Sequence, residues 1–233
     1  MLEGRRKCSI FAGHDFRQSC EALVQQMTKE IYETPLDYLI TVDREKYVEY
    51  LVNKYSMAPV RFAFLDLSVE PGEAEIPVEQ FPFKSEGSKG RRYRAPVYRY
   101  HLPYTGAQQL LSAIPDPNIP VEYDVDINPD SVSFVIVDFH NDPDRIKKEA
   151  YRIVGMIKRQ SEHLRNNIEA YVGELWQKAR YSFDLRRTEL LQQQKVTNAL
   201  GVPVRRRALA KNEKRKHEAA SLWWFHQYNT QQG

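Results

Sequence analysis

The chain has few of the residues that would tie it to an oxidising compartment or to a membrane. Only Cys8 and Cys20 are cysteines among 233 residues, too few for the disulfide framework of a secreted scaffold. No stretch approaches the roughly 18 consecutive apolar residues of a transmembrane helix, and the N-terminus has no apolar run typical of a signal peptide. We therefore expect a cytoplasmic protein without membrane contact.

The chain also has no complete catalytic motif. It contains no GxSxG, P-loop or GxGxxG sequence, and its six histidines are scattered. A dispersed catalytic site leaves no trace in one sequence, so the question whether the protein is an enzyme stays open. We expect a non-enzymatic protein without a cofactor.

One short motif points elsewhere. LPYTG (102–106) fits the LPxTG pattern that sortases cleave in cell-wall proteins. A sorting signal also needs an apolar segment and a basic tail directly after the motif, whereas here a long stretch of folded-looking sequence follows. We interpret LPYTG as a strand that leads into a turn at Gly106.

The first 60 residues have helical spacing. Apolar residues recur every three or four positions over 15–33 and again over 43–55, which predicts two amphipathic helices. Asp15 and Asp43 directly precede these segments and are the expected N-caps.

The middle of the chain has the pattern of strands. Segments 60–69 and 97–106 are rich in β-branched and aromatic residues, and 70–94 between them is predicted to be a long loop. Segments 121–127 and 131–139 flank a turn and predict an antiparallel hairpin.

A very long helix is predicted from Asp142 to about residue 199, ending near Gly201, with a possible bend near Ser182. Its apolar seam must be buried on the sheet, on the two N-terminal helices, or against a second copy. We expect a homo-oligomer formed through a coiled-coil-like seam. The residues predicted for this seam are Ile157, Leu164, Ile168, Tyr171 and Leu175.

The predicted fold is α+β, with a small antiparallel sheet, two N-terminal helices and one very long C-terminal helix. The expected divisions are an α+β domain (1–139), the long helix (140–203) and a basic–aromatic tail (204–233).

Asp138, His140 and Asp142 alternate along the chain at the start of the long helix. Carboxylates and imidazole are ligands of divalent cations, so this triplet is a candidate metal site. An Asp followed by Pro143 is equally typical of a helix N-cap and first helical residue.

The basic–aromatic tail is the most suggestive binding element. Residues 204–217 hold seven Lys or Arg against one Glu, a block able to contact phosphates. The aromatic residues that follow could stack on bases or dock into a protein groove. The candidate binding residues are Arg205, Arg206, Arg207, Lys211, Lys214, Arg215, Lys216, Trp223, Trp224 and Phe225.

The order of three stretches, YRYHLPYTGAQQLLSAIPDP, RNNIEAYVGEL and LGVPVRRR, is similar to the N-terminal region of a family of bacterial effector proteins. Their effector domains are of the restriction-endonuclease-like or Toll/interleukin-receptor-like kind, and many are linked to antiphage defence. The resemblance covers about residues 35–205. No effector sequence follows LGVPVRRR here, so the resemblance implies a sensing, scaffolding or assembly module and no catalytic residue.

The sequence therefore predicts a non-enzymatic subunit of a bacterial defence system. It would oligomerise through the long helix and dock a protein partner that carries the effector activity, or DNA or RNA, through its tail. The alternative is a metal-dependent nucleic-acid-processing enzyme that uses Asp138, His140 and Asp142.

Overall fold

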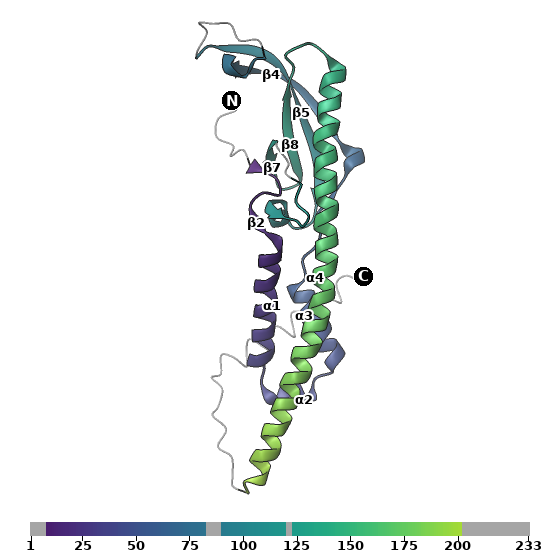
Figure 1. Cartoon of the computed structure of the whole chain (residues 1–233). Helices are drawn as coiled ribbons and strands as arrows, with labels where there is room; N and C mark the ends of the chain where they lie inside the picture. Colours follow the sequence, from purple (N-terminus) through teal and green to yellow (C-terminus); the bar gives the residue numbers. More distant parts are fainter. Residues whose placement is uncertain (1–7, 83–89, 120–122, 202–233) are drawn as a thin grey trace. The chain divides into compact units, whose positions relative to one another are not determined.

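The computed structural model describes residues 8–82, 90–119 and 123–201. The chain divides into two units, Met1–Arg187 and Thr188–Gly233, and the first contains the sheet, the N-terminal helices and most of the long C-terminal helix. It combines helices with an antiparallel sheet, which confirms the predicted α+β class (Figure 1).

The two predicted N-terminal helices are confirmed. Helix α1 is Phe16–Glu33 and helix α3 is Arg44–Tyr55. The Asp15 carboxylate accepts hydrogen bonds from the backbone N–H groups of Arg17 and Gln18, and Asp43 accepts one from Lys46 N at 2.9 Å. Both aspartates therefore satisfy amide groups that a helix start leaves unpaired.

A short helix between them, α2 (Leu36–Thr41), was not predicted. It directly follows Pro35. Helix α2 has six residues and one buried side chain, Leu39, which is too short a segment to show helical periodicity in the sequence. The structure therefore reveals this helix where the sequence pattern does not.

The main sheet is antiparallel throughout, and β5 (Arg92–Thr105) is its longest strand. One side of β5 pairs with β8, and the other side pairs with β4 and β3. The remaining strands of this sheet are β1 (Cys8–Ser9), β3 (Arg61–Phe62), β4 (Ser68–Pro77), β7 (Asp124–Ile127) and β8 (Ser131–Val137).

Short elements complete the unit. A two-residue parallel pair joins β2 (His14–Asp15) to β6 (Ala113–Ile114), directly before α1. The described residues also contain short 3₁₀ helices: η1 (Phe64–Asp66), η2 (Val78–Gln80) and η3 (Gln108–Ser112).

The predicted loop 70–94 is wrong, because β4 occupies most of its first part. Pro71, Gly72 and Pro77 suggested a loop, yet β4 pairs with β5 and, among the described residues, with no other strand, so it is an edge strand. An edge strand tolerates proline because one row of its amides needs no partner in the sheet. The predicted antiparallel hairpin is confirmed as β7 and β8.

The LPYTG stretch lies in the fold as expected. Leu102 and Tyr104 are buried within β5, and Gly106 follows the strand with a φ of +105°. A Cβ at Gly106 would collide with the carbonyl oxygen of Pro59. Glycine is required there by both the backbone angle and the space available.

The long helix is α4 (Pro143–Ala199), and it continues without a break at Ser182. The backbone N–H groups of Asp144 and Arg145 donate to the Asp142 carboxylate at 3.0 and 3.2 Å, so the helix starts where the sequence predicts. Gly201 follows its end with a φ of +65°.

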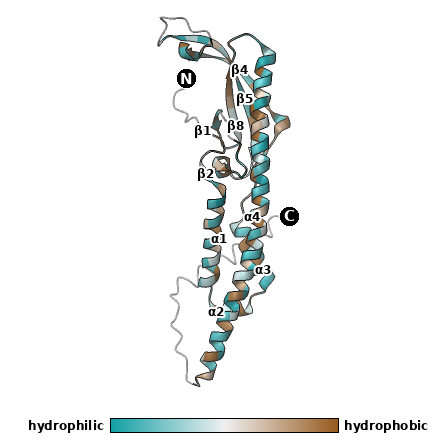
Figure 2. Ribbon diagram, viewed as in Figure 1, coloured by the Kyte–Doolittle hydropathy of each residue, from teal (hydrophilic) through white to brown (hydrophobic). Residues whose placement is uncertain are grey.

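The apolar seam of α4 is buried inside the single chain. All five predicted seam residues are at most 4% exposed, and Figure 2 shows hydrophobic and hydrophilic bands alternating along the helix. Tyr171, for example, packs edge-on against Phe16 of α1 and donates a hydrogen bond to Tyr55 O at 3.0 Å. The prediction of a seam between two copies is corrected, because these side chains are already covered by their own chain: Ile157, Leu164, Ile168, Tyr171 and Leu175.

Successive parts of α4 contact different elements of the first unit. Near its start, Lys158 Nζ lies 6.0 Å from the centre of the Phe64 ring in η1. Farther along, Phe183 packs against Tyr47 of α3, with ring centres 5.6 Å apart. The helix therefore covers the sheet region first and the N-terminal helices afterwards, as Figure 1 shows.

Within the described part of the chain, none of the helices has both the length and the hydropathy needed to cross a bilayer.

Candidate functional site: a groove between α1 and α4

The candidate metal triplet is a backbone-capping arrangement. Asp138 is buried, and its carboxylate accepts hydrogen bonds from His140 N at 3.0 Å and from Asp142 N at 3.4 Å. Asp142 in turn caps α4. No group of three or more His, Cys, Asp or Glu side chains suited to a metal ion occurs within residues 8–82, 90–119 and 123–201. The metal interpretation is corrected, because two of its three ligands serve the backbone.

The basic–aromatic tail lies outside the described residues, from Arg205 to Phe225. Its role in binding a partner or nucleic acid stays a prediction.

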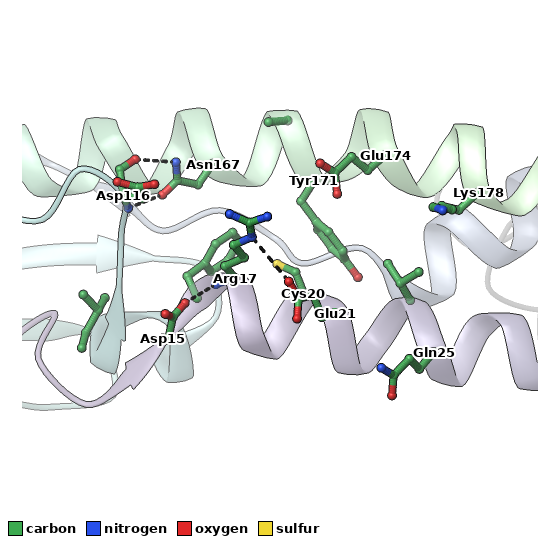
Figure 3. Close-up of a pocket in the computed structure, with 14 residues that line it drawn as sticks. Asp15, Arg17, Cys20, Glu21, Gln25, Asp116, Asn167, Tyr171, Glu174 and Lys178 are labelled. Atoms are coloured by element: carbon green, nitrogen blue, oxygen red, sulfur yellow. Dashed lines mark hydrogen bonds and ion pairs between the residues drawn. The ribbon is translucent and has the colours of Figure 1, made fainter.

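The structure reveals a site that the sequence analysis did not identify. A groove of about 580 Å³ lies between α1 and α4, and the segment after β6 closes one end of it (Figure 3). Its lining comes from three separate parts of the chain: residues 15–25, residues 114–116 and residues 167–178.

The base of the groove is largely apolar and already buried, since Phe16, Cys20 and Tyr171 are at most 7% exposed. Phe16, Cys20 and Val24 follow one another at four-residue intervals on the face of α1 that lines the groove, as the helical repeat requires. From α4, Ala170 and Tyr171 complete the base. Figure 3 shows the Cys20 sulfur directed into the space between the two helices.

Two reciprocal hydrogen bonds fix the closed end. The backbone N–H of Asp116 donates to Asn167 Oδ1 at 2.8 Å, and Asn167 Nδ2 donates to Asp116 O at 2.7 Å. The amide side chain thus bonds both polar groups of one backbone residue, which holds this segment against α4.

The rim of the groove carries more negative than positive charge. Arg17 and Lys178 are its basic residues, and Arg17 pairs with Glu21 at 3.4 Å through side chains that are mostly exposed. An exposed pair of this kind contributes little stability. The four acidic residues of the rim are Asp15, Glu21, Asp116 and Glu174.

The thiol at the base of the groove is protonated at neutral pH. Burial raises the pKa of Cys20 to about 12, and the negative charges of Glu174, Asp15 and Glu21 add to this effect. Because the thiolate is the nucleophilic form, Cys20 contributes apolar surface and a weak S–H donor to the groove.

The walls of the groove are tied to α3. On one side, Glu30 of α1 accepts hydrogen bonds from Lys54 Nζ at 2.7 Å and from Tyr55 Oη at 2.5 Å. On the other side, Arg44 of α3 binds both carboxylate oxygens of Asp184 on α4. Both helices that form the groove are therefore held by a common third helix.

Compared with known proteins, the chain matches no protein-family model, no curated protein and no solved structure.

The apolar spacing over residues 15–33 predicted a buried helix face, and Cys20 lies on it, but nothing in the sequence connects Cys20 with Tyr171 or Asp116. The spacing within α1 was the one available signal, and it indicates a buried face without revealing what covers it.

Proposed function

We propose that the chain is a non-enzymatic assembly subunit that docks a protein partner, in the cytoplasm, as part of a bacterial antiphage-type defence system. The defence role follows from the sequence resemblance, in which the partner carries the effector activity. The observation that supports docking is the groove between α1 and α4, with its charged rim.

The chemistry of the groove suits recognition. The base of the groove is already buried, so the exposed charges of its rim would select the partner and its orientation. Because both walls are already held by α3, the groove loses little conformational entropy when a partner binds, and binding costs less free energy. Because its pKa is raised, Cys20 is present as the thiol, which packs against apolar groups, and not as the nucleophilic thiolate.

The basic–aromatic tail belongs to the same proposal as a second contact, to a protein or to DNA or RNA. Seven cations in residues 204–217 would displace counterions from a phosphate backbone, and such binding weakens as salt rises. A homo-oligomer would have to use surfaces other than the seam of α4.

The test is loss of defence. Deleting the gene from its host should raise phage plating by about tenfold or more for at least one phage of a panel. Restoring the wild-type gene should reverse the effect. Unchanged plating across the panel would rule out the defence role.

A further inference from the structure

We propose that the outward face of the first half of α4 binds duplex DNA through its phosphate groups, with the helix lying along the major groove. This inference goes beyond the proposed docking of a protein partner, and it concerns a different surface from the groove between α1 and α4.

The first half of α4 is rich in cations. Residues 143–166 hold seven Lys or Arg and three Asp or Glu. One of the three acids, Glu149, is already paired with Arg152 at 2.8 Å. Such a surface attracts the phosphates of a nucleic acid and releases the counterions that surround them. Five of the cations are exposed and make no ion pair with any described residue: Lys147, Lys148, Lys158, Arg159 and Arg165.

These five cations form two rows along the helix. Lys147, Lys158 and Arg165 are spaced by eleven and seven residues, close to three and two helical turns, so they lie one above another. Lys148 and Arg159 are also eleven residues apart and form a second row, about 100° farther round the helix. Since the buried seam occupies the opposite side of α4, both rows point away from the rest of the chain.

The strip between the two rows has little side-chain bulk at its centre. Gly155 lies there, and an added Cβ would have no neighbouring atom within 4 Å. Tyr151, one turn earlier, is 61% exposed. A helix with cations on both sides and a glycine between them can enter a groove and reach the phosphates of both strands.

The face fits B-form DNA better than other nucleic acids. The major groove of DNA, about 12 Å wide, admits an α-helix, whereas the major groove of duplex RNA is deep and narrow. Single strands are typically held by several aromatic side chains that stack on bases, and Tyr151 is the one Phe, Tyr or Trp within residues 143–166. The distance from Lys147 to Arg165 is about 27 Å along the helix, which is within one turn of the duplex.

The experiment measures binding of a fluorescein-labelled DNA duplex of about 20 base pairs by anisotropy. The protein is the full chain in which the seven Lys and Arg residues of 204–217 are replaced by Gln, so that the basic–aromatic tail does not mask the contribution of α4. Binding should saturate and weaken as salt rises. A single strand or an RNA duplex of the same length should bind at least about fivefold more weakly.

The first pair of variants tests the cations. Replacing Lys147, Lys158 and Arg165 together by Gln should weaken binding of the DNA duplex at least about tenfold. It should also reduce the slope of log affinity against log salt by about one unit for each cation. The matched control loses the same charge at exposed positions of α1 and α3 and should keep its affinity within about twofold: Arg17→Gln, Lys29→Gln and Lys46→Gln.

The second pair of variants tests the shape of the face at constant charge. Gly155→Trp places bulk between the two rows, which should hold the helix out of the groove and weaken binding at least about tenfold. Gly173→Trp is the matched control, because Gly173 is an exposed glycine farther along α4 where an added Cβ also has no atom within 4 Å. It should bind DNA within about twofold of its parent. Circular dichroism confirms that each variant is folded.

Equal affinity in either variant and its control would overturn the inference, as would equal binding of the DNA and RNA duplexes. Polyglutamate that displaces the DNA as well as unlabelled duplex does, at an equal concentration of charge, would assign the face to an acidic protein and would also overturn it. Phage plating tests the proposed function separately, because none of these outcomes depends on the defence role.

Discussion

Arg44 and Asp184 form a two-pronged ion pair across 140 positions of sequence. Arg44 Nε donates to Asp184 Oδ1 at 2.7 Å, and Nη2 donates to Oδ2 at 2.5 Å. Glu45 extends the contact, because it accepts a hydrogen bond from Arg180 of α4 at 3.0 Å. These pairs fix the position of α3 along α4, and therefore the frame on which the groove is built.

Replacing Arg44 with Ala should lower the free energy of unfolding by about 1 kcal/mol, since the pair is bidentate but partly exposed and screened by water. A double-mutant cycle with Asp184→Ala, followed by urea denaturation, should give a coupling energy of about 0.5–1 kcal/mol that shrinks in high salt. A coupling of zero would show that the two side chains do not interact in solution. Arg44→Lys keeps the charge but loses one of the two hydrogen bonds to Asp184, so its unfolding free energy should lie between those of the wild type and Arg44→Ala.

The same pair makes stability depend on pH. The hydrogen bond from Arg44 is the main cause that lowers the pKa of Asp184 below its ordinary value. A carboxyl group with a lowered pKa in the folded state stabilises the fold above its unfolded pKa, and this contribution is lost as pH falls through the folded pKa.

We therefore expect Asp184→Asn to be less stable than the wild type at pH 7, and the difference to shrink as pH falls below the ordinary Asp pKa of about 3.9 and through the lowered pKa of the folded state. Urea midpoints at a series of pH values check this. When Arg44 is replaced by Ala, the stability difference caused by Asp184→Asn should depend less on pH. If this pH dependence is unchanged, a group other than Arg44 lowers the pKa of Asp184.

Gly106→Ala should destabilise the fold by about 1–3 kcal/mol, because the residue has a φ of +105° and an added Cβ meets the Pro59 carbonyl. Gly155→Ala is the matched control: it lies in α4 with no atom within 4 Å of the new Cβ, and it should stabilise by about 0.5–1 kcal/mol. Thermal unfolding measures both. Equal effects at the two sites would contradict the assigned turn geometry.

Ile168→Ala should cost about 2–4 kcal/mol of unfolding free energy, because the side chain is buried within the first unit. Tyr151→Ala, at a position of α4 that is 61% exposed, should cost much less. Light scattering should give the same mass for the folded Ile168→Ala protein as for the wild type. A lower mass would mean that Ile168 joins two copies.

Helix periodicity and caps predicted α1, α3 and the start of α4 well, since those signals are local. Asp15, Asp43 and Asp142 each cap the helix that the sequence assigned to them. Strand β4 was missed because prolines suggest a loop until it is known that the strand lies at an edge.

The partner of a buried stripe is harder to predict than the stripe itself. The spacing of Ile168, Tyr171 and Leu175 shows that they are buried, but a second copy and the chain's own helices satisfy that spacing equally. The groove was missed for the same reason. Its lining joins Cys20 to Asp116 and Asn167, and no local pattern connects segments so far apart.

The central claim is that one chain buries the apolar face of α4 by itself and leaves the groove for a partner. Trp176 lies on α4, beside Arg180, and reports unfolding there once Trp223 and Trp224 are replaced by Phe. The measurement is the urea midpoint from Trp176 fluorescence at protein concentrations from about 1 to about 100 µM. The account predicts one midpoint at all concentrations. A midpoint that rises with concentration would mean that a second copy covers this face.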